Sequence, residues 1–280
     1  MAADNNIHFR ILEDIAQDLS GELNFPTSLD AAIMVRNTLK DPEVKLDQVA
    51  RAIALEPLIA SKLLRLANSV VYNPAGQSIT DLKTAVTRMG FEAVRTTSLA
   101  VAMDQIMKSK NLANFDKFAK LTWEHSIQVA ATARVLARRV GRVNPEEALL
   151  AGLVHDIGIF YLLYRAAEYQ QYRESQEALI ELVAGWHESI GESLLHILGL
   201  PERIVNAVRD HDQLRDLDNP CTLSDVIYFA NLLSGGNFEW LPTGVNAIDQ
   251  AMVDTVRARY AALLEEAQDD IQELRAALSA

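Results

Sequence analysis

The sequence predicts an all-α protein, a multi-helix bundle that follows an N-terminal helical subdomain. Apolar residues recur three and four positions apart along most of the chain, which is the spacing of amphipathic helices. Only 12 of the 280 residues are glycine, and few segments alternate apolar and polar residues as half-buried strands do. The one strand-like cluster, Val70-Val71-Tyr72, is ended at once by the turn-forming Asn73-Pro74.

Short helices are expected in the first half of the chain. Asp47 is a suitable N-cap for the first of them. Glu56-Pro57 separates it from the next, because a residue before proline avoids the helical region. Gly90 is typical of a helix C-terminus, and a new helix begins at Phe91. The predicted helices before that point cover residues 48–55, 58–68 and 78–90.

Longer helices are expected after the polar residues 111–116. One covers about residues 115–140. Another begins at Asn144, an N-cap followed by Pro145 at the first helical position, and continues through Asp156. We expect an N-terminal subdomain over residues 1–112, a second helical subdomain over residues 113–240, and a C-terminal amphipathic helix over residues 241–280.

The C-terminal residues 245–278 carry apolar side chains on one stripe, among them Val256, Leu264 and Leu274. As one continuous helix they would extend about 50 Å. The stripe favours a helix packed along its own subdomain, and the alternative is a helix that forms a homo-oligomer.

Composition excludes several classes of protein. Hydrophobic residues make up 49% and charged residues 23% of the chain, which excludes wholesale disorder. The net charge of −12 disfavours stable binding to nucleic acid. Cys221 is the only cysteine, so neither a disulfide framework nor a cysteine-ligated zinc site can form. The polar, acidic opening and the lack of a long uncharged apolar stretch predict no membrane span and a cytoplasmic location.

The histidines are the candidate functional residues. Glycine-rich phosphate loops and serine-nucleophile motifs are absent, which predicts no nucleotide cofactor, and Cys221 alone is a poor nucleophile. Four of the six histidines lie on apolar helical stripes or at the end of one, namely His125, His155, His187 and His211. His8 and His196 lie off such stripes.

Each of these four histidines by itself is best interpreted as an ordinary core residue. Together they would be costly to bury unless partners satisfied them. Convergence on a metal cluster would satisfy all of them at once. The adjacent pair His155-Asp156 suits a two-metal site, because the carboxylate can bridge two ions while the imidazole binds one of them.

The histidine pattern resembles that of the HD superfamily of metal-dependent phosphohydrolases. The resemblance lies in His125, in the motif His155-Asp156-Ile157-Gly158 and in the spacing of His187 and His211. The first half of the chain points to one branch of that superfamily. Three segments are similar to the HDOD domain, the HD-related output domain of bacterial signalling proteins. They are Phe25-Pro26, residues 56–69 with Leu63-Leu64-Arg65-Leu66-Ala67-Asn68-Ser69, and residues 85–90. The resemblance covers roughly residues 20–235.

The resemblance implies that the metal ligands are His125, His155 and Asp156, with His187 and His211 as in the dinuclear HD-GYP branch, and that Asp156 would be catalytic in an active site. The chain departs from the family pattern at three places. Asn231 replaces the last aspartate and offers only a neutral oxygen as a substitute ligand. Ile159 replaces the lysine that would bind a substrate phosphate, and the GYP signature after His211 is missing.

We therefore expect a bacterial regulatory module with a degenerate HD site, which binds a signalling protein or a small effector. Four imidazoles suit iron, manganese, zinc or nickel better than magnesium. The alternative is a metal-dependent phosphohydrolase that hydrolyses a nucleotide or cyclic nucleotide through metal-activated water. A helical scaffold whose histidines only fill the core is the third reading. All five predicted ligands should converge on one centre, and hydrolysis should be weak or absent.

Arg65 and Asn68 lie in the most family-like stretch of the first subdomain. We expect them to contact the second subdomain and to shape a groove between the two. The alternative is that Asn68 only stabilises the next turn.

Overall fold

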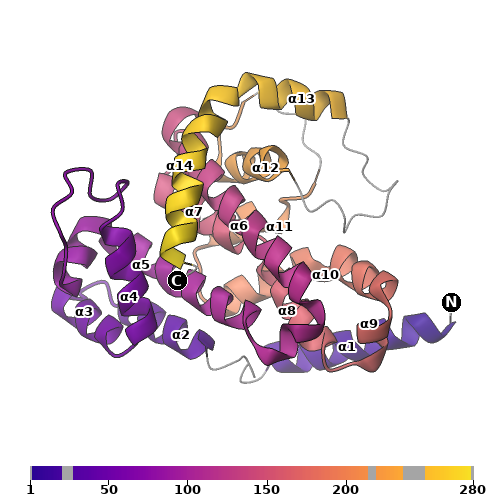
Figure 1. Ribbon diagram of the computed structural model, residues 1–280. Helices are drawn as coiled ribbons and strands as arrows, with labels where there is room; N and C mark the ends of the chain where they lie inside the picture. The colour runs from indigo at the N-terminus through magenta and orange to yellow at the C-terminus, as the bar shows by residue number, and fades with distance from the viewer. Residues whose placement is uncertain (1, 21–27, 214–218, 236–249, 279–280) are drawn as a thin grey trace.

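The computed structural model describes residues 2–20, 28–213, 219–235 and 250–278 of the chain (Figure 1). These residues form helices, turns and loops without a β-strand, which confirms the predicted all-α class. Val70, Val71 and Tyr72 lie in turns, because their backbone has no neighbouring strand with which to pair. The elements, in chain order, are α1 (Ala2–Ser20), α2 (Ser28–Leu39), α3 (Leu46–Ala54), α4 (Pro57–Ala67), α5 (Leu82–Met107), η1 (Lys110–Phe115), α6 (Asp116–Leu136), η2 (Ala137–Gly141), α7 (Pro145–Val154), α8 (Ile157–Ala166), α9 (Gln170–Glu174), α10 (Gln176–Ile197), α11 (Glu202–Arg209), α12 (Leu223–Leu233), α13 (Gln250–Arg259) and α14 (Ala261–Leu278).

The first subdomain consists of α2 to α5. The fourth of these helices begins at Leu82 rather than at residue 78, because the side chain of Asp81 caps it by accepting from the Thr84 N–H. Gly90 interrupts it with φ 81° and ψ 168°, which a residue with a side chain rarely adopts. The helix resumes beyond that kink, and its second half contacts α7 and α8 in the other subdomain.

The N-terminal helix α1 lies with the second subdomain, not with the first. Figure 1 shows it away from α2 to α5 and beside α8 and α10, which it contacts. Ile11 and Ile15 are one turn apart and fully buried there. The Tyr161 hydroxyl donates to Asp18 at 3.2 Å on the same face. Residues 2–20, which the sequence analysis grouped with the first subdomain, thus pack on helices of the second.

The second subdomain is built around α6, α7, α8, α10, α11 and α12. The predicted helix through Asp156 is broken there, since Asp156 has φ −98° and ψ 18° and separates α7 from α8. Residues Pro145–Ala166, which include both helices, are long and apolar enough to cross a membrane, although the sequence analysis expected no such stretch. In the fold 89% of its most apolar 18-residue window is buried, so its apolarity is accounted for by the core.

The C-terminal helix α14 lies along α6 and also contacts α4 and α5, as Figure 1 shows. Its Asp270 accepts from the buried Arg134 of α6 at 3.0 Å. Lys62 of α4 donates to the carbonyl oxygen of Leu278, and Arg65 donates to that of Ala276 at 3.1 Å. Of the predicted apolar stripe, Val256, Ile271 and Leu274 are buried within the chain, whereas residues 245–249 lie outside the described part. The helix α14 contacts both subdomains.

Candidate metal centre

The four stripe histidines and Asp156 meet between the helices of the second subdomain. His125 comes from α6, the pair His155-Asp156 from the junction of α7 and α8, His187 from α10, and His211 from the turn after α11. His125, His155 and Asp156 form one group whose ligand atoms all lie within 4.8 Å of one another. Asp156, His187 and His211 form a second group at the same separation. The convergence expected from the sequence is present.

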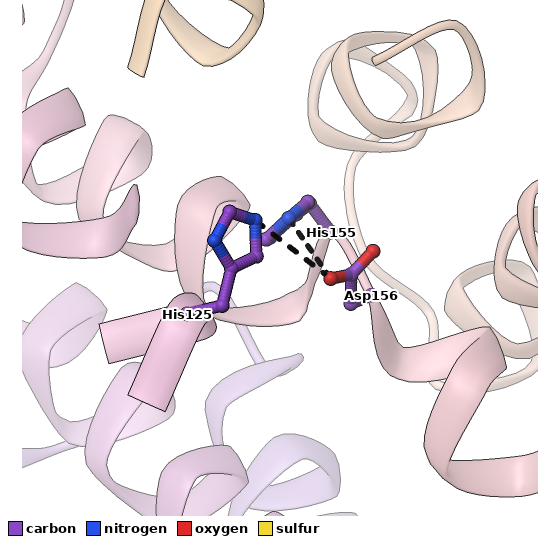
Figure 2. Close-up of side chains that lie close together, drawn as sticks. All are labelled: His125, His155 and Asp156. Carbon is purple, nitrogen blue, oxygen red and sulfur yellow. Dashed lines mark ion pairs between the residues drawn. The ribbon is translucent and has the colours of Figure 1, made fainter. Parts of the chain in front are cut away.

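Asp156 belongs to both groups and faces each with a different oxygen. Figure 2 shows its carboxylate beside His125 and His155, whose Nε2 atoms lie 4.0 and 3.2 Å from Oδ2. The other oxygen, Oδ1, lies 3.3 Å from the Nε2 of His211. This is the arrangement of a carboxylate that can bridge two cations.

Asp212 supplies a second carboxylate that the sequence analysis did not assign to the site. Its Oδ2 lies 3.2 Å from the Nε2 of His187, and its Oδ1 lies 3.6 Å from the Nε2 of His211. The sequence held a signal for it, because His211-Asp212 repeats the His155-Asp156 dipeptide just after an amphipathic helix. Asp156 therefore serves both histidine groups, and Asp212 adds a second carboxylate to the group of His187 and His211.

Asn231 lies inside the centre and connects its two sides. Its Nδ2 donates to Asp212 Oδ1 at 2.8 Å. A carboxylate can only accept, so the amide oxygen faces the other way, 2.9 Å from the Nε2 of His125. His125 therefore carries a proton on Nε2 and donates it to Asn231.

Backbone carbonyls fix the other three imidazoles in the opposite tautomer. The Nδ1 atoms of His155, His187 and His211 lie 2.7, 2.9 and 2.7 Å from the carbonyl oxygens of Gly152, Val183 and Val208. A carbonyl only accepts, so each Nδ1 carries the hydrogen and each Nε2 of a neutral ring presents a lone pair to the centre. This is the usual outer contact of a metal-ligating histidine.

These lone pairs fit a metal ion. The Nε2 atoms of His155 and His211 are buried without a hydrogen-bond partner, although carboxylate oxygens lie 3.2 and 3.3 Å away. A lone pair and a carboxylate repel at that distance unless a cation lies between them. Ligands about 2.1 Å from one ion lie roughly 3.0–3.4 Å from one another. The separations of Asp156 from His155 and His211, 3.2 and 3.3 Å, lie in that range.

Without a metal, protons take the place of the cation. Burial opposes a charge on His211, yet Asp212 and Asp156 raise its pKa to about 10. Burial likewise opposes a charge on His187, and the contact with Asp212 raises its pKa overall. The pKa of Asp156 is held well below its ordinary value by His155 and His211, in spite of its burial. Burial and the neighbouring His155 lower the pKa of His125 to about 4, so His125 is neutral.

Gly158 of the motif positions α8 against α10. A Cβ atom on Gly158 would lie 2.0 Å from the backbone oxygen of His187, which no side chain can tolerate. The absence of a side chain lets the two helices approach closely, and the approach brings His187 to Asp156. The glycine of the motif is therefore a packing requirement of the centre.

The remaining candidates lie elsewhere or have other roles. Ile159 is only 3% exposed, so its side chain belongs to the core. His8 contacts Tyr172, and the half-exposed His196 lies near two glutamates, so neither joins the centre. Cys221 is exposed in a loop.

Asn68 does not reach the second subdomain. Its side chain donates to the carbonyl oxygens of Leu64 and Ile79 at 2.8 and 2.7 Å, and it accepts from the Ile79 N–H at 2.8 Å. It closes the loop between α4 and α5, as in the alternative that the sequence left open. Arg65 does leave its subdomain, but its partner is the C-terminal helix.

A family model described as the HDOD domain matches residues 25–214. A protein of Treponema pallidum named only as uncharacterized is 23% identical over 219 residues, which are 73% of this chain and 40% of that protein. The chain thus spans less than half the length of that relative.

Two solved structures share the fold. One is a Shewanella amazonensis SB2B protein provisionally named a metal-dependent phosphohydrolase, with a TM-score of 0.76 at 23% identity, covering 99% of this chain and 100% of that one. The other is a Marinobacter aquaeolei VT8 protein provisionally named a signal transduction protein, with a TM-score of 0.59 at 18% identity, covering 98% of this chain and 66% of that one. At these identities the likeness concerns the fold.

Proposed function

Because the chain belongs to the HDOD domain family, we propose that it is a bacterial signal-transduction module whose buried His/Asp centre binds a divalent transition metal without hydrolysing phosphoesters. Its output is the binding of a partner protein or a small effector in the cytoplasm. The Marinobacter protein of similar fold carries a signalling name, which supports this reading.

The observation that carries the metal proposal is the set of three Nε2 lone pairs aimed at two carboxylates. His155, His187 and His211 are held in that tautomer by backbone carbonyls. Imidazole ligands favour iron, manganese, zinc or nickel over magnesium. His155 and Asp156 would hold one ion with His125 or Asn231, and His187, His211 and Asp212 would hold the second with Asp156.

Two features support the proposal that the centre does not hydrolyse phosphoesters, namely the burial of its ligands and the replacement of the phosphate-binding lysine. A bound metal supplies electrophilic stabilisation of a phosphoryl group and lowers the pKa of water. This chain offers little room for a substrate beside it, since the four imidazoles and Asp156 are each at most 6% exposed. The family's phosphate-binding lysine is replaced by the buried Ile159. A stable, enclosed metal suits a structural or sensing centre.

The second candidate function is a metal-dependent phosphohydrolase, and one observation favours it. Asp212 adds the negative charge that the Asp-to-Asn replacement at residue 231 removes, and its side chain is 25% exposed, the most open part of the centre. The Shewanella protein of similar fold carries a phosphohydrolase name.

The test combines elemental analysis with hydrolysis assays. We expect purified protein to contain transition metal, and Asp156→Asn to lose it, while His196→Gln keeps it as the matched control outside the centre. With bis-p-nitrophenyl phosphate and cyclic dinucleotides, turnover should stay at background after loading with iron, manganese, zinc or nickel. Metal-dependent turnover that Asp156→Asn abolishes would establish the hydrolase instead. Protein that cannot be loaded with any of these metals would remove both functions.

A further inference from the structure

We infer that a second site exists on the same subdomain, a pocket that binds a small organic anion carrying a planar ring. It lies between the first turn of α6 and the helices α9 and α10, at the lower end of α6 in Figure 1. We call it the ring-anion pocket and define it by Phe115, Lys117, Phe118, Leu121, Tyr172 and Arg173. Its volume of about 320 Å³ is within the range of small-molecule sites.

The floor of the ring-anion pocket is apolar and aromatic. Phe115 is 6% exposed and Tyr172 only 1%, so both are packed firmly beneath the pocket. The Tyr172 hydroxyl lies 3.0 Å from the Nδ1 of His8 in α1, which holds the ring in place there. The accessible apolar surface comes from the half-buried Phe118 and from Leu121, which is 40% exposed. An aromatic ring beside an aliphatic side chain suits a flat apolar group.

The rim of the ring-anion pocket is positively charged. Lys117 and Arg173 line it, and no carboxylate does so in the part of the chain that the structure describes. The acids that adjoin Lys117 and Arg173 in the sequence have other partners. Asp116 pairs with Lys120 at 2.8 Å, and Glu174 accepts from Gln170 at 2.7 Å.

Both cations are free to bind an anion. Arg173 donates to the Ala167 carbonyl at 2.6 Å, which fixes its guanidinium and leaves other N–H groups available. Lys117 has no ion-pair partner among the described residues. Two unneutralised cations around one cavity stand out in a chain whose net charge is −12. Charge complementarity therefore favours an anionic ligand, and the apolar surface of the pocket favours a ligand with a flat ring.

The ring-anion pocket is separate from the metal centre but uses the same helices. Leu121 lies one turn before His125 on α6, and Leu179 of the pocket lies two turns before His187 on α10. The offset along α10 is about 12 Å at 1.5 Å per residue. An occupant would thus be an effector beside the centre, and its binding does not require the metal of the proposed function.

The inference is tested by isothermal titration of the full chain with 1-naphthoate and adenosine 5′-monophosphate, in the presence of EDTA. Both probes carry a ring and an anionic group. The probe with the lower dissociation constant indicates whether the pocket prefers a carboxylate or a phosphate. 1-Naphthalenemethanol, which has a ring without charge, and inorganic phosphate, which has charge without a ring, should bind at least ten-fold more weakly.

Variants locate the binding site. Lys117→Gln and Arg173→Gln should each weaken binding about ten-fold, and Leu121→Glu should abolish it by placing a negative charge at the mouth. Lys110→Gln is the matched control, since it removes an exposed charge of η1 that does not line the pocket. Circular dichroism confirms folding of each variant. No binding of either ring-bearing anion below 1 mM, or equal weakening by Lys110→Gln, overturns the inference. Metal content plays no part in these outcomes, so they are independent of the proposed function.

Discussion

Asn231 donates its amide hydrogen to Asp212 at 2.8 Å, so the residue that replaces the superfamily's last aspartate contacts a carboxylate that the sequence analysis did not assign to the centre. The amide at residue 231 introduces a hydrogen-bond donor where the superfamily pattern has a carboxylate. The contact orients Asp212 towards His187 and His211. The centre therefore contains a second negative charge, at Asp212, although residue 231 is neutral.

Asn231→Asp should change stability and metal affinity in opposite directions. In the metal-free protein a second carboxylate would face Asp212 and the donor would be lost, at a cost of about 1–3 kcal/mol. With metal, the added charge becomes favourable, so affinity should rise about ten-fold or more. Calorimetric melting and chelator competition measure the two effects. An unchanged affinity would show that residue 231 lies outside the metal's reach. Adding Ile159→Lys is a poorer test, because Ile159 is buried.

Metal uptake should release protons and strengthen as pH rises. The pKa values of His187 and His211 are raised, the latter to about 10, by the carboxylates beside them. Raised values mean that these protons stabilise the metal-free fold fully below the unfolded pKa of about 6.5, and that this stabilisation is lost as pH rises through the folded values. A metal must displace them, so apparent affinity should increase from about pH 6 to about pH 8.

Titration calorimetry in buffers of different ionisation enthalpy counts the protons released. His196→Gln should leave the count unchanged, because His196 lies off the centre. A proton count of zero would contradict the expected protonation of His187 and His211.

Gly158→Ala should disrupt the centre through packing alone. The added methyl group would lie 2.0 Å from the His187 backbone oxygen, so α8 and α10 must separate. We expect a loss of several kcal/mol or failure to bind metal, as overpacking of a core costs about 1–3 kcal/mol even in milder cases. Gly185→Ala on α10 is the control, since nothing lies within 4 Å of its added methyl. That change should be neutral or stabilising by up to about 1 kcal/mol. Equal stability of the two variants would contradict the packing role.

Asn68→Ala should lower stability without affecting the metal centre. It removes two hydrogen bonds to the backbone of Ile79 and one to Leu64, worth roughly 1–3 kcal/mol together. Thermal melting should shift down, while metal content and ligand binding stay at wild-type values. A change in metal content or in ligand binding would instead support the hypothesis that Asn68 shapes a groove between the subdomains.

The sequence by itself determined the helical class and the set of inward histidines. Both follow from local periodicity, since spacing along a helix fixes which side chains share a buried face. His125, His187 and the other two imidazoles could thus be selected before any contact was known. The adjacent pair His155-Asp156 then identified their partner, Asp156, and the resemblance implied that all five residues are metal ligands.

The tertiary structure alone decided which buried faces meet. Periodicity states that a face of α1 is buried, but not that it packs on α8 and α10, because an apolar stripe has no preference among apolar partners. The same reason hid Asp212, whose place in the centre depends on how α11 is set against α10 and α12. It also hid the local role of Asn68, because a polar side chain at a helix end can bond to its own loop or to another subdomain.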